Sequence, residues 1–190
     1  AHIKNFVAGE WVAGKGEAIS VESPYFGEVV AEINGTEPSE LDNALSAARE
    51  AFHSWSATPL KERTQVMFRF RNRLLENIEA VAQTVSLENG KTLAESRAGI
   101  LKGVEVLEFA LSLQNLDQGA KMEVSRGVSC EYRREPIGLV LNITPFNFPA
   151  MVPMWTLPIA MVVGNAFVWK PSEKTPMTSQ WIASLFDQAG

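Results

Sequence analysis

Ile137-Gly138-Leu139-Val140-Leu141-Asn142-Ile143 is the stretch that decides the fold, and Thr144-Pro145-Phe146-Asn147-Phe148-Pro149 follows it directly. A short apolar run bounded by turn residues is typical of a strand buried in a parallel sheet. After the proline-rich turn, the pattern predicts an apolar helix over 150–163, a strand over 166–170 and a final helix over 178–189. The order β-α-β-α predicts the start of a doubly wound parallel sheet, and therefore an α/β fold.

The first part of the chain predicts two pairs of strands followed by a helix. Residues 6–12 have the pattern of a tight hairpin, and 19–23 with 29–33 have that of a second strand pair. From Thr36 onward the apolar residues recur at helical spacing. Thr36 or Ser39 is available to cap this first helix.

Three more helices are expected between the hairpins and the sheet. They are predicted after Pro59, over 78–89 with a stop at Gly90, and over about 92–116. Gly99 and Gly103 each cost the last helix roughly 1 kcal/mol relative to alanine. We therefore expect another backbone to pack closely against them. A strand is predicted over 128–134 before the deciding stretch.

The composition excludes several classes of function. Hydrophobic residues make up 46% of the chain and charged residues 21%, which is typical of a globular protein and not of a disordered one. The net charge of −5 combines mixed signs, so no basic face is predicted to bind nucleic acid. Three prolines and a glycine interrupt the most apolar stretch, 146–169, whereas a membrane span needs about 20 uninterrupted apolar residues. We expect no membrane insertion.

The cysteine and histidine counts bound the location and the metal chemistry. Cys130 is the only cysteine, which excludes a disulfide within the chain and favours a cytoplasmic location, or the mitochondrial matrix in a eukaryote. A lone cysteine is usually a packed apolar residue. The two histidines, His2 and His53, are too isolated in the sequence to hold a metal ion, so no metal site is predicted.

Two motifs follow the predicted parallel strands, at the sheet edge where ligands bind in open α/β folds. In the first, prolines flank Asn147 closely, so its amide either donates to a developing oxyanion or satisfies backbone groups in a tight turn. In the second, Lys170 ends a strand and Glu173 follows three residues later. This pair either binds the hydroxyls of a ribose or forms an ordinary surface ion pair.

These motifs, in this order and at this separation, resemble the aldehyde dehydrogenase superfamily. The resemblance rests on 143–149 and 164–176, and extends upstream to Gly9-Glu10-Trp11, Glu88-Asn89-Gly90-Lys91 and 134–138. It covers essentially the whole chain. It implies NAD as the cofactor, although the chain has no G-x-G-x-x-G turn after its strands.

The resemblance also assigns roles to individual residues. Asn147 matches the catalytic side-chain donor of the oxyanion hole, which stabilises the adduct of a cysteine thiolate with the aldehyde. Cofactor-binding positions are matched by Thr144 and Phe146 in the first motif, and by Lys170, Glu173 and Lys174 in the second. Cys130 lies far upstream of where the family has its nucleophile, so we expect this chain alone to be inactive.

One branch of the superfamily matches in more detail. Phe146 before Asn147, followed by 151–155, resembles the methylmalonate-semialdehyde (malonate-semialdehyde) dehydrogenases, which release an acyl-CoA. This implies coenzyme A as the acyl acceptor. In that branch, an arginine on the fourth helix is expected to bind the substrate carboxylate. This chain has Lys102 at that position. Lysine keeps the charge and lacks the bidentate fork of arginine.

By this resemblance, residues 1–190 form the amino-terminal part of an NAD-binding domain. We expect four segments: β-hairpins over 1–35, helices over 36–117, an oligomerisation strand region over 120–136, and the first β-α-β-α of the nucleotide-binding sheet over 137–190. Two parallel strands do not make a stable sheet, so a truncation at Gly190 is expected. A homodimer or homotetramer is expected. The alternatives are a hydrolytic aldehyde dehydrogenase with another substrate, and a truncated module without catalytic activity.

Overall fold

The structure is a computed structural model that describes residues 1–116 and 119–190. Residue 117, the predicted end of the helical segment, lies outside the described residues. The elements follow in the order β1 (His2–Ile3), β2 (Asn5–Val7), β3 (Glu10–Val12), β4 (Ala18–Glu22), β5 (Val29–Asn34), α1 (Pro38–Ala57), α2 (Leu60–Glu76), α3 (Ile78–Asn89), α4 (Leu93–Ser112), η1 (Leu113–Asn115), β6 (Gly119–Ser125), β7 (Val128–Arg133), β8 (Leu139–Ile143), α5 (Met151–Met154), α6 (Leu157–Val162), β9 (Ala166–Lys170) and α7 (Pro176–Asp187).

Both predicted strand pairs near the N-terminus are confirmed. β2 and β3 form the tight hairpin, and β4 pairs antiparallel with β5. The short strand β1 adds to the other edge of β5 in parallel, which the sequence did not predict because two residues carry no periodic pattern.

The four predicted helices are confirmed and build the core with the segments that follow them. Met67, Phe70 and Leu74 on α2 are fully buried in this core, which α3, α4, α6 and α7 also enter. The predicted caps of the first helix are wrong. α1 begins at Pro38, and the Glu40 carboxylate accepts a hydrogen bond from the Glu37 N–H at 2.9 Å. Proline suits the first helical position because that N–H has no partner in a helix.

The two glycines of α4 differ in their surroundings. A Cβ on Gly103 would lie 2.9 Å from Cγ of Met154 and 3.4 Å from the Ala150 carbonyl oxygen, which confirms the expected close packing. A Cβ on Gly99 would meet nothing within 4 Å, so the expectation is wrong there. α4 therefore packs against α5 through Gly103.

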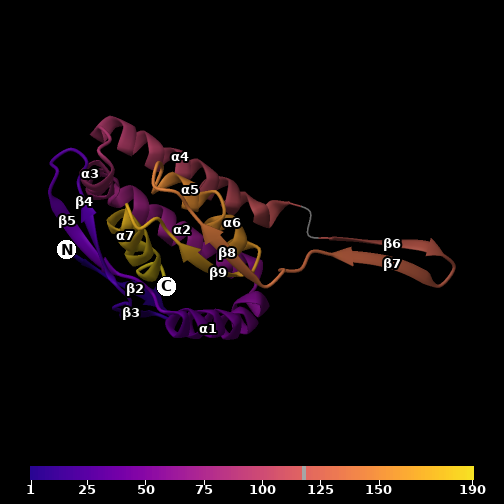
Figure 1. Cartoon of the computed structure of the whole chain (residues 1–190). Coiled ribbons are helices and arrows are strands. Elements are labelled where there is room, and N and C mark those ends of the chain that lie inside the picture. The colour runs from indigo at the N-terminus through magenta and orange to yellow at the C-terminus, as the bar shows by residue number, and fades with distance from the viewer. Residues whose placement is uncertain (117–118) are drawn as a thin grey trace.

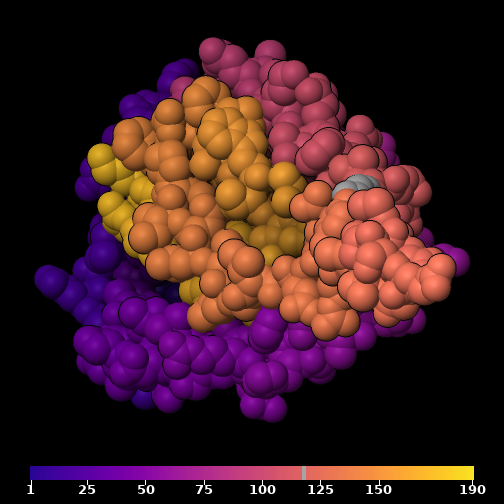
Figure 2. Space-filling view, turned by 90° about the vertical axis from the view of Figure 1, so that its right-hand side faces the viewer, coloured from indigo at the N-terminus to yellow at the C-terminus, as the bar shows by residue number. Residues whose placement is uncertain are grey.

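The predicted parallel sheet begins as expected, with β8 parallel to β9. The helix expected over 150–163 is instead two short helices, α5 and α6, because Pro158 has no N–H with which to continue the α5 hydrogen bonds. The strand expected from Ile137 begins at Leu139, and Ile137 is 87% exposed. β8 is not buried either, since Leu141 is 59% and Ile143 67% exposed. Figure 2 shows this part of the chain, in orange and yellow, uncovered between α1 below and α4 above.

A two-stranded arm projects from the body of the molecule (Figure 1). It consists of β6 and β7, which pair antiparallel. The sequence predicted β7 and not β6. All residues of both strands are exposed, including Cys130, so the expectation that this cysteine is packed is wrong. Within the described residues, none of the helices has the length and apolar character needed to cross a membrane.

Candidate cofactor and oxyanion site

The ends of β8 and β9 bring the two sequence motifs side by side. Ile143 lies opposite Lys170 in the parallel register, and the Thr144 N–H donates to the Lys170 carbonyl at 3.1 Å. The Trp169 indole N–H donates to the Thr144 hydroxyl at 2.8 Å. The loop that carries Asn147 and the turn that carries Glu173 therefore start from the same sheet edge, as the sequence predicted for two parallel strands.

Two charged side chains of the second motif pair with each other, and a third lies over the first motif. Nζ of Lys170 is 3.0 Å from Oε2 of Glu173, and both side chains are more than half exposed. The Glu173 backbone N–H and the Lys170 ammonium hold the pKa of the Glu173 carboxyl below its usual value. Nζ of Lys174 lies 4.7 Å from the centre of the Phe146 ring. This edge thus offers an accessible carboxylate, two ammonium groups and a half-exposed aromatic ring.

Thr144 has a different position from these four residues. It is 4% exposed, and its hydroxyl accepts the Trp169 hydrogen bond. The buried Thr144 side chain therefore links the ends of β8 and β9. Its contribution to a ligand site is to fix the loop that leaves β8.

The Asn147 side chain is exposed at the tip of the first loop. Within the described part of the chain, only its backbone carbonyl is engaged in a hydrogen bond, donated by the Lys91 ammonium at 2.5 Å. The side-chain amide therefore has its donors available. That geometry suits a donor to an oxygen atom of a bound molecule, and it differs from the alternative of an amide that satisfies the turn.

Lys102 lies on α4. Its ammonium is 2.7 Å from the Glu105 carboxylate on the same helix, and its side chain is 65% exposed. The described contacts of Lys102 do not include the Asn147 loop. In the structure this predicted substrate residue is paired with Glu105.

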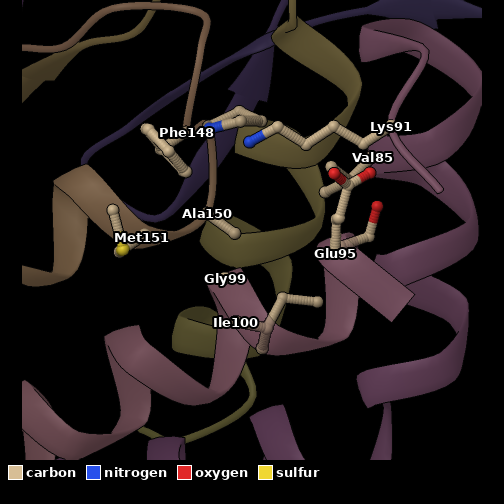
Figure 3. A pocket seen from close by; sticks show the side chains of 10 residues that line it. Val85, Lys91, Glu95, Gly99, Ile100, Phe148, Ala150 and Met151 are labelled. Carbon is tan, nitrogen blue, oxygen red and sulfur yellow. The ribbon is translucent and has the colours of Figure 1, made fainter. Parts of the chain in front are cut away.

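Three further residues support the site. In the sequence they were noted only as part of the family resemblance, and no role was predicted for them. Asn89 and Lys91, at the end of α3, donate to the carbonyls of Phe146 and Asn147. Figure 3 shows the Lys91 side chain extending toward Phe148, with the Glu95 carboxylate beside it. The contacts join segments 56 and 57 residues apart, and no local pattern predicts such pairs.

Glu88 is the third supporting residue and anchors α7. It is 3% exposed, and its carboxylate accepts hydrogen bonds from the N–H groups of Met177 and Thr178, both at 2.8 Å, and from the Thr178 hydroxyl. Burial raises the pKa of Glu88 to about 7, while the hydrogen bonds from Thr178 and Met177 act in the opposite direction. Because α7 follows the turn that carries Glu173, this contact helps to fix that turn.

Comparison with known proteins agrees with this geometry. The model of the aldehyde dehydrogenase family matches residues 11–190. Malonate-semialdehyde dehydrogenase 2 of Geobacillus thermodenitrificans and malonate-semialdehyde dehydrogenase of Halalkalibacterium halodurans are each 41% identical to the chain over 190 residues. The alignments cover 99% of this chain and 39% of each relative, so the chain spans about two fifths of their length.

Solved structures match over the same part. A putative methylmalonate-semialdehyde dehydrogenase from Sinorhizobium meliloti, complexed with NAD, is 34% identical with a TM-score of 0.96, covering 100% of this chain and 39% of that one. Betaine aldehyde dehydrogenase from Staphylococcus aureus, in complex with NAD⁺, is 29% identical with a TM-score of 0.93, covering 98% of this chain and 38% of that one. The chain belongs to the aldehyde dehydrogenase family.

Proposed function

We propose that this chain is the amino-terminal part of a longer NAD-dependent enzyme that oxidises a semialdehyde. The observation that carries the proposal is the common edge of β8 and β9, from which Asn147 and the Lys170–Glu173 pair both extend. The relatives with malonate-semialdehyde and methylmalonate-semialdehyde dehydrogenase names support the substrate class. By "the full-length protein" we mean the complete reading frame that contains this chain.

The residues at this edge fit the adenosine part of NAD. The ionised Glu173 carboxylate accepts hydrogen bonds from ribose hydroxyls, and the Lys170 ammonium beside it donates to them. Phe146 and Lys174 flank the same space. Thr144 acts by holding the loop against Lys170. When bound, NAD supplies the acceptor for the hydride of the aldehyde.

Asn147 contributes to the chemical step. A cysteine thiolate from the remaining part of the full-length protein attacks the aldehyde carbon, and the carbonyl oxygen becomes an oxyanion. The free Asn147 amide donates to that oxygen, which stabilises the transition state more than the ground state. Cys130 does not serve as the nucleophile, because it lies on the exposed arm formed by β6 and β7.

The acyl group leaves as a thioester of coenzyme A, a proposal that rests on the resemblance to the semialdehyde branch. In this proposal Lys102 offers its charge to the substrate carboxylate after exchanging its present partner, Glu105. Release of a free acid is the alternative outcome. Product analysis with and without coenzyme A distinguishes the two outcomes.

The proposal includes the organisation of the whole protein. Residues 1–190 are the first part of the NAD-binding domain, with the hairpins, the helices, the arm and the sheet as successive segments. The arm of β6 and β7 has exposed edges and joins subunits into a homodimer or homotetramer. The single cysteine accords with a cytoplasmic or matrix location.

The test of the proposed function is Asn147→Ala in the full-length protein. We expect kcat to fall by about 100- to 1000-fold, because one oxyanion donor is lost. The affinity for NAD and the melting temperature should stay close to those of the wild type. Single-turnover hydride transfer at saturating NAD is the measurement. A rate within about threefold of wild type, or a loss explained by weaker NAD binding, contradicts the oxyanion role.

A further inference from the structure

The end of α3 holds the Asn147 loop at two consecutive peptide groups. The Asn89 side-chain amide donates to the Phe146 carbonyl at 2.8 Å, and the Lys91 ammonium donates to the Asn147 carbonyl at 2.5 Å. These two carbonyls belong to the peptide groups on either side of the Asn147 Cα. Fixing both peptide planes fixes the backbone angles of Asn147, and with them the direction of its Cα–Cβ bond.

Lys91 makes a further contact with the same loop. Its Nζ lies 3.7 Å from the centre of the Phe148 ring, the residue directly after Asn147. A cation over an aromatic face contributes about 0.5–1 kcal/mol at an exposed site and more when it is desolvated. Partial burial lowers the pKa of Lys91, whereas the charge of Glu95 raises it. The ammonium thus contacts the Asn147 carbonyl and the Phe148 ring. The Glu95 carboxylate lies beside it (Figure 3).

The local sequence explains how both side chains reach the loop. Gly90 ends α3 in the left-handed conformation, with φ of +80°, and this reverses the chain between Asn89 and Lys91. Thr92 then caps α4 and fixes the Glu95 carboxylate by two hydrogen bonds, at 3.0 and 2.7 Å. Lys91 is therefore confined between the ends of two helices.

We propose that Asn89 and Lys91 are positioning residues that aim the Asn147 amide at the oxyanion. This inference rests on the proposed function, since it assigns a purpose to the orientation of Asn147. It concerns residues that touch neither substrate nor cofactor in that proposal. Their effect passes through the loop backbone, and a misplacement of about 1 Å at a reacting group costs up to roughly 100-fold in rate.

The test compares three variants of the full-length protein. Lys91→Met removes the ammonium and keeps the rest of the side-chain length, whereas Lys91→Arg keeps a cationic donor. Lys61→Met, at an exposed position on α2, is the matched control. We expect Lys91→Met to slow single-turnover hydride transfer by roughly tenfold or more at saturating NAD, with the NAD dissociation constant unchanged. Lys91→Arg should restore most of the rate, and the control should behave as the wild type.

A double-mutant cycle separates positioning from general stability. In the Asn147→Ala background, Lys91→Met should change the hydride-transfer rate by less than about twofold, because the group that it aims is gone. An equal loss in both backgrounds, or an unchanged rate with Lys91→Met alone, overturns the inference while leaving the role of Asn147 intact. If Asn147→Ala itself leaves hydride transfer unchanged, or if the full-length protein forms no NADH, the proposed function fails and the inference fails with it.

Discussion

At the scale of single residues, the proposed contact of Glu173 with a ribose predicts which cofactor the full-length protein prefers. At the proposed ribose site, its half-exposed carboxylate would repel the 2′-phosphate of NADP, an effect that Lys170 and Lys174 would partly offset. We expect a higher kcat/KM with NAD than with NADP. Glu173→Gln should bring the two values closer, whereas Glu62→Gln on α2 should leave their ratio unchanged. A wild-type ratio that favours NADP is incompatible with Glu173 at the ribose.

Glu88 makes the stability of the chain depend on pH. Its pKa in the folded protein, raised by burial to about 7, lies above the value of 4.5 for an unperturbed carboxyl. The folded state therefore retains a proton that the unfolded state has lost, and the resulting stability is complete below pH 4.5 and lost as the pH rises through 7. Relative to Glu88→Gln, the free energy of unfolding of the wild type should fall by about 3 kcal/mol over this range.

Urea unfolding of both proteins at pH 5 and pH 8 measures the effect of Glu88. The variant is the reference because it keeps a hydrogen-bonding side chain and cannot titrate. A wild type that gains stability relative to Glu88→Gln as the pH rises would mean that the three hydrogen bonds from α7 outweigh burial and keep the carboxylate charged in the folded state.

At the scale of elements, α4 contains a matched pair of glycines with opposite surroundings. Gly99→Ala should raise the free energy of unfolding by about 0.5–1 kcal/mol, because the new Cβ meets open space and alanine favours the helix. Gly103→Ala should lower it by about 1–3 kcal/mol, since the Cβ would press on the buried Met154. Thermal unfolding of the two variants checks the sign. Stabilisation by both substitutions would show that α5 shifts freely away from α4.

The elements differ in how well the sequence predicted them. β9 and α3 matched their predictions closely, since a short apolar run or a helical pattern between clear stop signals reports the backbone directly. The prediction of one helix over 150–163 was wrong, because it followed the apolar composition of this segment and gave too little weight to Pro158. β6 was missed because its pattern has no buried face: every residue of the strand is exposed.

At the scale of the whole molecule, this chain alone should have no dehydrogenase activity. It carries the proposed oxyanion donor and part of a cofactor site, and its only thiol is on the arm. We expect no NADH from propanal or a semialdehyde with the purified chain. Activity that Cys130→Ser abolishes would refute this expectation. Activity that survives the substitution would indicate a contaminating enzyme.

The uncovered face of β8 is also a property of the whole molecule. Leu141 and Ile143 are largely exposed although their sequence is typical of a buried strand. The apolar sequence of residues 137–143 therefore fits a strand that other parts of a larger sheet or domain would cover. The disagreement between pattern and exposure supports the proposal that further chain covers this face in the full-length protein.

The sequence by itself determined the α/β class, the order of most elements, and the residue types at the two strand ends. These follow from periodicity, prolines and glycines, which act on the backbone within a few residues. Only the tertiary structure decided that Lys91 contacts Asn147 and that Glu88 anchors α7. Contacts between distant segments depend on how helices pack against the sheet, and packing leaves no local pattern in a single sequence.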